Sequence, residues 1–193
     1  MHRLSSSFIL GYHGCDEAVG ERLLNGASFV PSDNDYDWLG SGIYFWEANP
    51  LRALDWAREL QQPRSGTTES IQNPFVVGAV IELGYCLDLI SSNGTSAVRA
   101  AYSDFRKRLD ASGKALPKNF GGIDLLLRRL DCAVINHLHN VRRETGQPGF
   151  DTVRGVFIEG KPIYENSGFR EKTHIQICVR NPEVIKGVFR VPQ

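Results

Sequence analysis

The stretch from 75 to 83 constrains the fold most. It reads Phe-Val-Val-Gly-Ala-Val-Ile-Glu-Leu, a nearly unbroken apolar run rich in Val, Ile and Phe. Such a run is typical of a strand buried within a sheet. We therefore predict a buried strand there. The apolar pattern and the turn residues predict further strands over 7–12, 42–46, 86–90, 153–158, 174–179 and 184–191.

Four helices are expected between these strands. Asp16 is a suitable N-cap for a helix over 17–24, and Pro50 can open a second helix that runs to 61. Apolar residues at helical spacing predict two more helices over 96–111 and 124–143. A polar loop is expected over 63–74. The mixed order predicts an α+β fold in a single domain over 1–193, with a helical insert over about 91–148.

Composition excludes several classes of function. Lys plus Arg and Asp plus Glu number 22 each, so net charge gives no general reason to bind nucleic acid or an anionic membrane. No stretch has the length or apolarity of a signal peptide or a membrane span. The four cysteines are scattered without metal-ligand spacing, so we expect reduced thiols, a cytoplasmic location and no metal site.

Two short motifs stand out. Residues 11–14 read Gly-Tyr-His-Gly at the expected end of the first strand, where His13 can bond a ligand hydroxyl. Residues 40–45 read Gly-Ser-Gly-Ile-Tyr-Phe. There Gly42 allows the backbone to approach a ligand closely, and Tyr44 can stack on a flat heterocycle. Each motif alone is also compatible with ordinary core packing.

Together the two motifs resemble the ADP-ribosyltransferase superfamily, in particular its poly(ADP-ribose) polymerase-like branch. The resemblance implies a split, antiparallel-rich β core that binds NAD+ as substrate. It implies that His13 bonds the adenosine ribose, that the Gly14 backbone holds the nicotinamide amide and that Tyr44 stacks on nicotinamide. Tyr12 and His174 are further candidates for cofactor contacts.

The family has a third element, a Glu on a late strand that engages the nicotinamide ribose. Gln176 falls closest to that position in the strand over 174–179. A glutamine can hydrogen-bond the ribose but cannot act as a base near neutral pH. We therefore expect Gln176 to complete a catalytic set with His13 and Tyr44, with His174, Glu171 and Glu159 as alternatives for the missing base.

These features predict a mono-ADP-ribosyltransferase that moves ADP-ribose from NAD+ to an unknown protein or nucleic-acid acceptor. A compact enzyme of this kind resembles intracellular toxins and defence effectors, which implies a neutralising antitoxin as a partner. An NAD+ glycohydrolase, a non-catalytic NAD+ or ADP-ribose reader, and a purely structural domain remain as alternatives. Arg154 is expected to form an ion pair with Asp151 rather than to meet the pyrophosphate.

Overall fold

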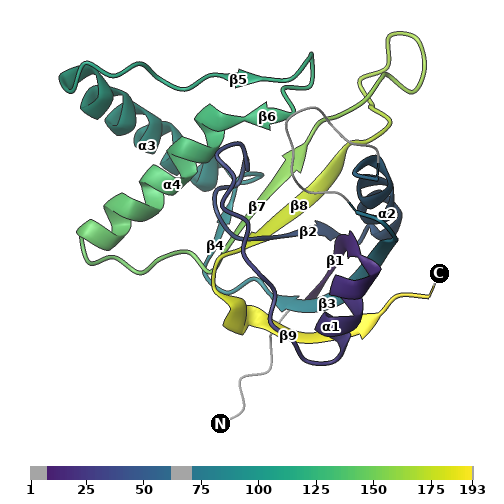
Figure 1. Ribbon diagram of the computed structural model, residues 1–193. Helices are drawn as coiled ribbons and strands as arrows, with labels where there is room; N and C mark the ends of the chain where they lie inside the picture. Colours follow the sequence, from purple (N-terminus) through teal and green to yellow (C-terminus); the bar gives the residue numbers. More distant parts are fainter. Residues whose placement is uncertain (1–7, 62–70, 193) are drawn as a thin grey trace.

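The computed structural model describes residues 8–61 and 71–192, and it has an α+β fold (Figure 1). The polar loop expected over 63–74 lies mostly outside the described residues. The helices are α1 (Glu17–Leu24), α2 (Pro50–Glu59), α3 (Ser92–Ala111) and α4 (Arg129–Glu144). The strands are β1 (Phe8–Asp16), β2 (Ile43–Glu47), β3 (Pro74–Glu82), β4 (Cys86–Asp88), β5 (Asn119–Phe120), β6 (Leu127–Arg128), β7 (Thr152–Phe157), β8 (His174–Val179) and β9 (Ile185–Arg190).

A seven-stranded sheet forms the centre of the structure, in the order β4-β7-β8-β2-β1-β3-β9. All neighbouring pairs are antiparallel except β4 and β7, which run parallel. β5 and β6 form a separate hairpin between α3 and α4. The expected α+β class is therefore confirmed, and the buried strand predicted over 75–83 is β3.

The ladder between β1 and β2 is the shortest in the main sheet. Their ladder holds only the pairs Gly11–Glu47 and Tyr12–Trp46, whereas β1 pairs with β3 along its whole length from Phe8 to Asp16. Beyond Tyr12, β1 therefore continues beside β3, whereas its ladder with β2 has ended. All seven strands still form one hydrogen-bonded series, so the described residues form one continuous main sheet rather than two.

The two faces of the sheet are covered by different helices. Opposite residues of an antiparallel pair share a face, so Tyr12, Trp46 and Gln176 lie on one face, which we call the tryptophan face. Ala53 of α2 packs on this face beside Trp46, and Ile135 of α4 packs there beside Cys178. α1 covers the opposite face, where its Leu23 joins a buried cluster of the sheet.

Local sequence explains these helix positions. The Asp16 carboxylate accepts a hydrogen bond from the Ala18 amide at 3.0 Å and so caps α1. The Asn49 side chain caps α2 through the Arg52 amide at 3.0 Å, and Pro50 is the first helical residue. Both helices begin where the sequence predicts, and α1 also ends there.

Three expected boundaries were wrong by four residues or more. The third helix, α3, begins at Ser92 and not at 96, because the Ser91 side chain accepts a hydrogen bond from the Gly94 amide at 3.0 Å and caps it. The first strand does not end at residue 12 but runs to Asp16, because its ladder with β3 continues to Pro74. The last long helix begins at Arg129 and not at 124. Leu125 has a φ of +50°, Leu127–Arg128 pairs with Asn119–Phe120, and the Asn119 side chain accepts a hydrogen bond from the Leu130 amide at 2.8 Å. The segment 91–148 thus holds a hairpin as well as helices.

All four cysteines are free thiols, and three of them, Cys15, Cys132 and Cys178, are buried. Burial raises the pKa of the Cys178 thiol to about 12, so this group stays protonated. Across residues 8–61 and 71–192, no helix is long and apolar enough to span a membrane.

Candidate functional site

His13 lies within β1, not at its end as the sequence predicted, and its ring is largely enclosed by aromatic neighbours. Phe29 and Phe45 lie 5.4 and 5.7 Å away between ring centroids. The His13 Nδ1 atom is 2.9 Å from the carbonyl oxygen of Tyr44. Because a carbonyl only accepts, Nδ1 carries the proton, and Nε2 of the neutral ring is an acceptor. Burial lowers the pKa of His13, which keeps the ring neutral near pH 7.

The Tyr44 ring lies on the tryptophan face, away from the His13 ring. Its hydroxyl donates to the Gly40 carbonyl at 2.8 Å and accepts from the Leu39 amide at 2.9 Å. Burial raises the pKa of Tyr44 well above its usual value. The ring packs against the buried cluster that contains Leu39 and Cys178. The Tyr44 side chain is therefore hydrogen-bonded to the loop before its own strand. The hydrogen bond from His13 goes to the backbone of Tyr44 and not to its ring.

Packing explains the glycines of both motifs. A Cβ atom on Gly14 would lie 2.3 Å from the Ala53 carbonyl oxygen of α2. One on Gly42 would lie 2.5 Å from Cys178 Sγ, and one on Gly40, which has a φ of +82°, would lie 2.8 Å from Asn136 Oδ1. These close approaches are to the protein itself, to α2, β8 and α4. The glycines are therefore needed to assemble the core, whether or not a ligand also uses them.

Gln176 lies in the middle of β8 on the tryptophan face and is 9 % exposed. It pairs with Trp46 of β2 and with Gly155 of β7. Its Oε1 atom accepts a hydrogen bond from Trp38 Nε1 at 2.6 Å. A Cβ on Gly155 would lie 2.7 Å from the Trp38 ring, so only glycine leaves room for this indole. Since Trp38 holds the oxygen, the amide nitrogen of Gln176 is the end that can donate to a ligand.

His174 lies two residues before Gln176 on the same face and is enclosed by aromatic rings. Phe157 stacks on it at 5.5 Å between centroids, and Trp46 lies 6.1 Å away. Its Nδ1 donates to the Lys172 carbonyl at 2.6 Å, which leaves Nε2 as an acceptor. Burial is the main cause that lowers the pKa of His174, so the ring is neutral near pH 7.

Two buried ring nitrogens of this region, like Nε and Nη1 of the nearby Arg52, have no hydrogen-bond partner among the described residues. They are Nε2 of His174 and Nε1 of Trp46. Buried polar groups are nearly always bonded, so each such group calls for an explanation. Trp56 lies 5.3 Å from Trp46 between ring centroids. The three tryptophans of the chain thus gather near His174 and Gln176, and the unused hydrogen-bonding capacity there belongs to Trp46 and His174.

Glu159, one alternative for the missing base, is held in a buried ion pair. Arg52 Nη2 contacts its two carboxylate oxygens at 3.2 and 2.9 Å, and both residues are under 9 % exposed. Oε2 of Glu159 is also 4.0 Å from His174 Nδ1. Lys172 binds Glu59 at 2.7 Å and lies 4.0 Å from Glu159. Glu171 is exposed on the preceding loop. Of the two acids, the structure places only Glu159 beside β8.

The expected Asp151–Arg154 ion pair was wrong. Arg154 binds Glu47 at 2.6 Å, and the Asp151 carboxylate instead accepts from the Tyr85 amide and the Asn181 side chain, each at 2.8 Å. The reason is the alternation of a strand, because residues three apart point to opposite faces. Within the described residues, no group of three or more His, Cys, Asp or Glu side chains is placed to hold a metal ion.

Sequence reasoning missed the roles of Trp38, Trp46, Arg52 and Phe157. Trp38 and Trp46 flank the Gly-Ser-Gly-Ile-Tyr-Phe motif, so their position beside it was the available signal. No local signal indicated Arg52, which lies 107 positions from Glu159 in the sequence. Of the predicted residues, the structure brings together Tyr12, Tyr44, His174 and Gln176 on one face and leaves the His13 ring on the other.

Comparison with known proteins gives a relative but no function. The chain is 28 % identical over 194 residues to an uncharacterized protein, MJ0359, of Methanocaldococcus jannaschii. The match covers 91 % of this chain and 83 % of the relative. No family model matches the chain, and no solved structure matches it.

Proposed function

We propose that this chain binds NAD+ where β1, β2 and β8 adjoin and transfers the ADP-ribose unit to a macromolecular acceptor. The proposal includes an ADP-ribosyltransferase type of fold. One observation carries it. The three segments of the sequence resemblance, which begin near residues 11, 40 and 174, fall on three successive strands in the order β8-β2-β1. The proposal thus rests on the motifs and on their adjacency.

The end of the β1–β2 ladder supports a place for the cofactor. There the His13 ring reaches the Tyr44 carbonyl of the neighbouring strand. Nε2 of His13 can accept a hydrogen bond from a ribose hydroxyl. On the tryptophan face, the Gln176 amide nitrogen can donate to the second ribose, and the Trp46 indole can donate to the nicotinamide carbonyl. A dinucleotide carries a matching group for each of these atoms, and the sheet separates the His13 ring from the other two.

The reaction breaks the bond between the ribose C1′ atom and the nicotinamide nitrogen. The electron pair leaves with nicotinamide, which departs neutral, and positive charge develops on the ribose ring. An acceptor nucleophile then bonds C1′ and loses its proton. Neutral His174 can take that proton at Nε2, since its lowered pKa keeps this atom unprotonated near pH 7. Positioning by Gln176 and electrostatic stabilisation supply the rest of the rate.

A second function, binding of NAD+ without cleavage, is favoured by a specific feature of β8. Gln176 stands where the family has a carboxylate, and the nearest buried carboxylate, Glu159, is bound by Arg52. In such a reader the same residues would hold the cofactor, and the bond to nicotinamide would stay intact. The two functions differ in one measurable product, which is free nicotinamide.

The test is nicotinamide release from NAD+ by the purified protein, alone and with cell lysate, beside His13→Asn. Asparagine keeps a donor near the Nδ1 position for the Tyr44 carbonyl but removes the Nε2 acceptor. His137→Gln is the matched control, because His137 bonds Asp104 through Nε2 at 2.8 Å between α3 and α4. We expect release that requires lysate, is lost in His13→Asn and is unchanged in His137→Gln.

The other results are equally informative. Release without lysate indicates a glycohydrolase. Saturable NAD+ binding that is lost in His13→Asn, without release of nicotinamide, indicates a non-catalytic reader. Absence of NAD+ binding in a folded wild-type protein refutes the proposed function.

A further inference from the structure

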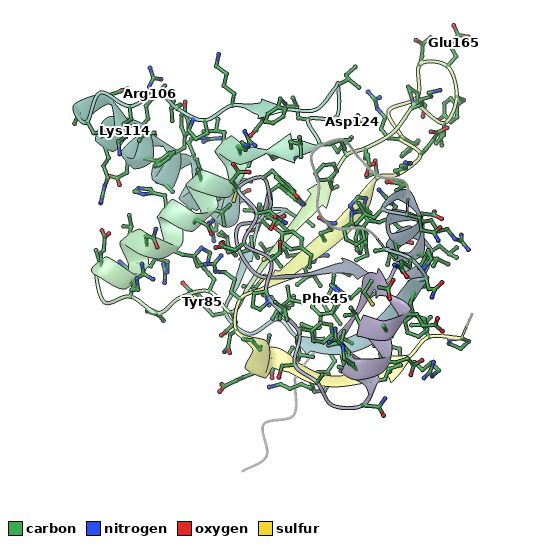
Figure 2. All side chains as sticks on the ribbon, viewed as in Figure 1. Phe45, Tyr85, Arg106, Lys114, Asp124 and Glu165 are labelled. Atoms are coloured by element: carbon green, nitrogen blue, oxygen red, sulfur yellow. The ribbon has the colours of Figure 1, made fainter. Side chains whose placement is uncertain are left out.

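An open basin lies at the C-terminal end of α4. It has a volume of about 590 Å³ and is lined by His139, Arg143, Arg180, Phe150 and the loop residues 146–149. This volume is in the range of small-molecule binding sites. Figure 2 shows Tyr85 beside the segment that follows α4, far from Glu165 at the tip of the loop before β8.

Arg143 and Arg180 line the basin, and Arg142 lies over the ring of Phe150 beside it. None of the three has an ion-pair partner among the described residues. Arg143 bonds only the Asn140 side chain, at 2.9 Å. Arg180 bonds the Ser41 carbonyl at 2.7 Å and Asn136 Oδ1 at 3.2 Å. Arg142 bonds the Pro148 carbonyl at 2.8 Å. All of these acceptors are neutral, so no carboxylate of the described residues forms an ion pair with the three guanidinium groups.

Nearby carboxylates have other partners. Glu144, the next residue of α4, is bound by Arg108 of α3 at 3.4 Å. Asp151, which follows Phe150, accepts from the Tyr85 amide and from Asn181. The C-terminal end of a helix favours cations, and this explains Arg142 and Arg143 in part. It does not explain Arg180, which comes from the end of β8.

The remaining wall of the basin is neutral and aromatic. Phe150 stacks on Tyr85 at 4.7 Å between centroids, and the Arg142 guanidinium lies 4.5 Å from the Phe150 ring centre. Burial, with the charges of Arg180 and Arg142, lowers the pKa of His139 to about 4. His139 therefore adds no charge at neutral pH, and the arginines alone set the charge of the basin.

We propose that this basin binds a phosphate group, with Arg143 and Arg180 donating to its oxygens. Both guanidinium groups keep N–H donors free of any described partner, and guanidinium geometry suits phosphate oxygens. The phosphate can belong to a free nucleotide or to a nucleic-acid strand. The proposal goes beyond NAD+ chemistry and does not depend on it.

The test is isothermal titration at low ionic strength without NAD+, using inorganic phosphate, 5′-AMP, adenosine and a single-stranded DNA decamer. Arg143→Ala is the main variant, and Arg143→Gln is a second one that keeps a hydrogen-bonding side chain. Arg99→Ala is the matched control, since Arg99 is an exposed arginine of α3. Thermal unfolding of each variant verifies that it is folded.

We expect phosphate and 5′-AMP to bind the wild type and Arg99→Ala, and to bind both Arg143 variants about tenfold more weakly. Adenosine should not bind, and added salt should weaken the binding. Tighter binding of the decamer than of 5′-AMP, with the same loss in the Arg143 variants, assigns the phosphate to nucleic acid. The reverse order assigns it to a free nucleotide. The proposal is overturned if no phosphate probe binds, or if the folded Arg143 variants bind as the wild type does.

Discussion

Replacement of Gly14 by alanine tests whether this glycine is needed for packing between β1 and α2. The added Cβ would lie 2.3 Å from the Ala53 carbonyl oxygen and 3.3 Å from the Trp56 ring, whereas ordinary contacts begin at 3.4 Å. α2 would have to move by about 1 Å to restore an ordinary contact. It is not free to do so, because Ala53 and Ala57 are fully buried and Arg52 is bound to Glu159.

We therefore expect Gly14→Ala to lower the free energy of unfolding by about 3 kcal/mol, at the upper end of overpacking effects. For a chain of this size the melting temperature should fall by roughly 6–12 °C. Urea denaturation followed by tryptophan fluorescence measures the change. Gly187→Ala is the matched control, because a Cβ there meets nothing within 4 Å, and it should stay within about 0.5 kcal/mol of wild type. Equal stability of Gly14→Ala and wild type would refute the packing argument.

Three further predictions concern the Arg52–Glu159 ion pair, the buried histidines and the hydrogen bond from Trp38 to Gln176. Glu159→Leu should cost about 3 kcal/mol of stability because it leaves Arg52 buried without its closest partner; the double variant Arg52→Met with Glu159→Leu should recover most of that loss in urea denaturation. Burial lowers the pKa of His13, His139 and His174 in the folded chain. Below about pH 6.5 these side chains therefore take up protons in the unfolded chain that they do not take up in the folded one. The free energy of unfolding should fall there by at most about 1.4 kcal/mol per pH unit for each histidine. Denaturation at pH 7 and pH 5 measures this loss, and His139→Gln should reduce it; a stability independent of pH over this range would contradict the burial of these rings. Trp38→Phe removes the donor to Gln176 Oε1 and should slow any nicotinamide release by about fivefold with little change in melting temperature, whereas unchanged release would show that Gln176 needs no anchoring.

Local signals made most secondary structure predictable. α1 and β8 have the bounds expected from the sequence, and β3 coincides with its apolar run to within a residue at each end. A cap residue, a proline at a helix start and apolar periodicity act on neighbours in the chain, so they are visible without tertiary structure. The start of α4 was missed because its cap comes from Asn119, ten residues upstream of Arg129. The residues directly before α4 form β6, which pairs with β5.

The candidate site was predictable only in part. The sequence singled out the motifs around His13 and Tyr44 and the strand of Gln176, and the structure places them on successive strands. The direction of the side chains was not, since it depends on the register between strands. A shift of one residue moves a side chain to the other face, and the pair Tyr12–Trp46 places the His13 and Tyr44 rings on opposite faces.

The sequence by itself determined the class of fold, the main helices and strands, and the residues that resemble an NAD+ site. Each of these depends on the identity and spacing of residues close together in the chain. Only the tertiary structure decided that Trp38 holds Gln176, that Arg52 binds Glu159, and that Arg180 and Arg143 line one basin beside the end of α4. These contacts join segments far apart in sequence, and they form because sheet order and helix packing bring those segments together.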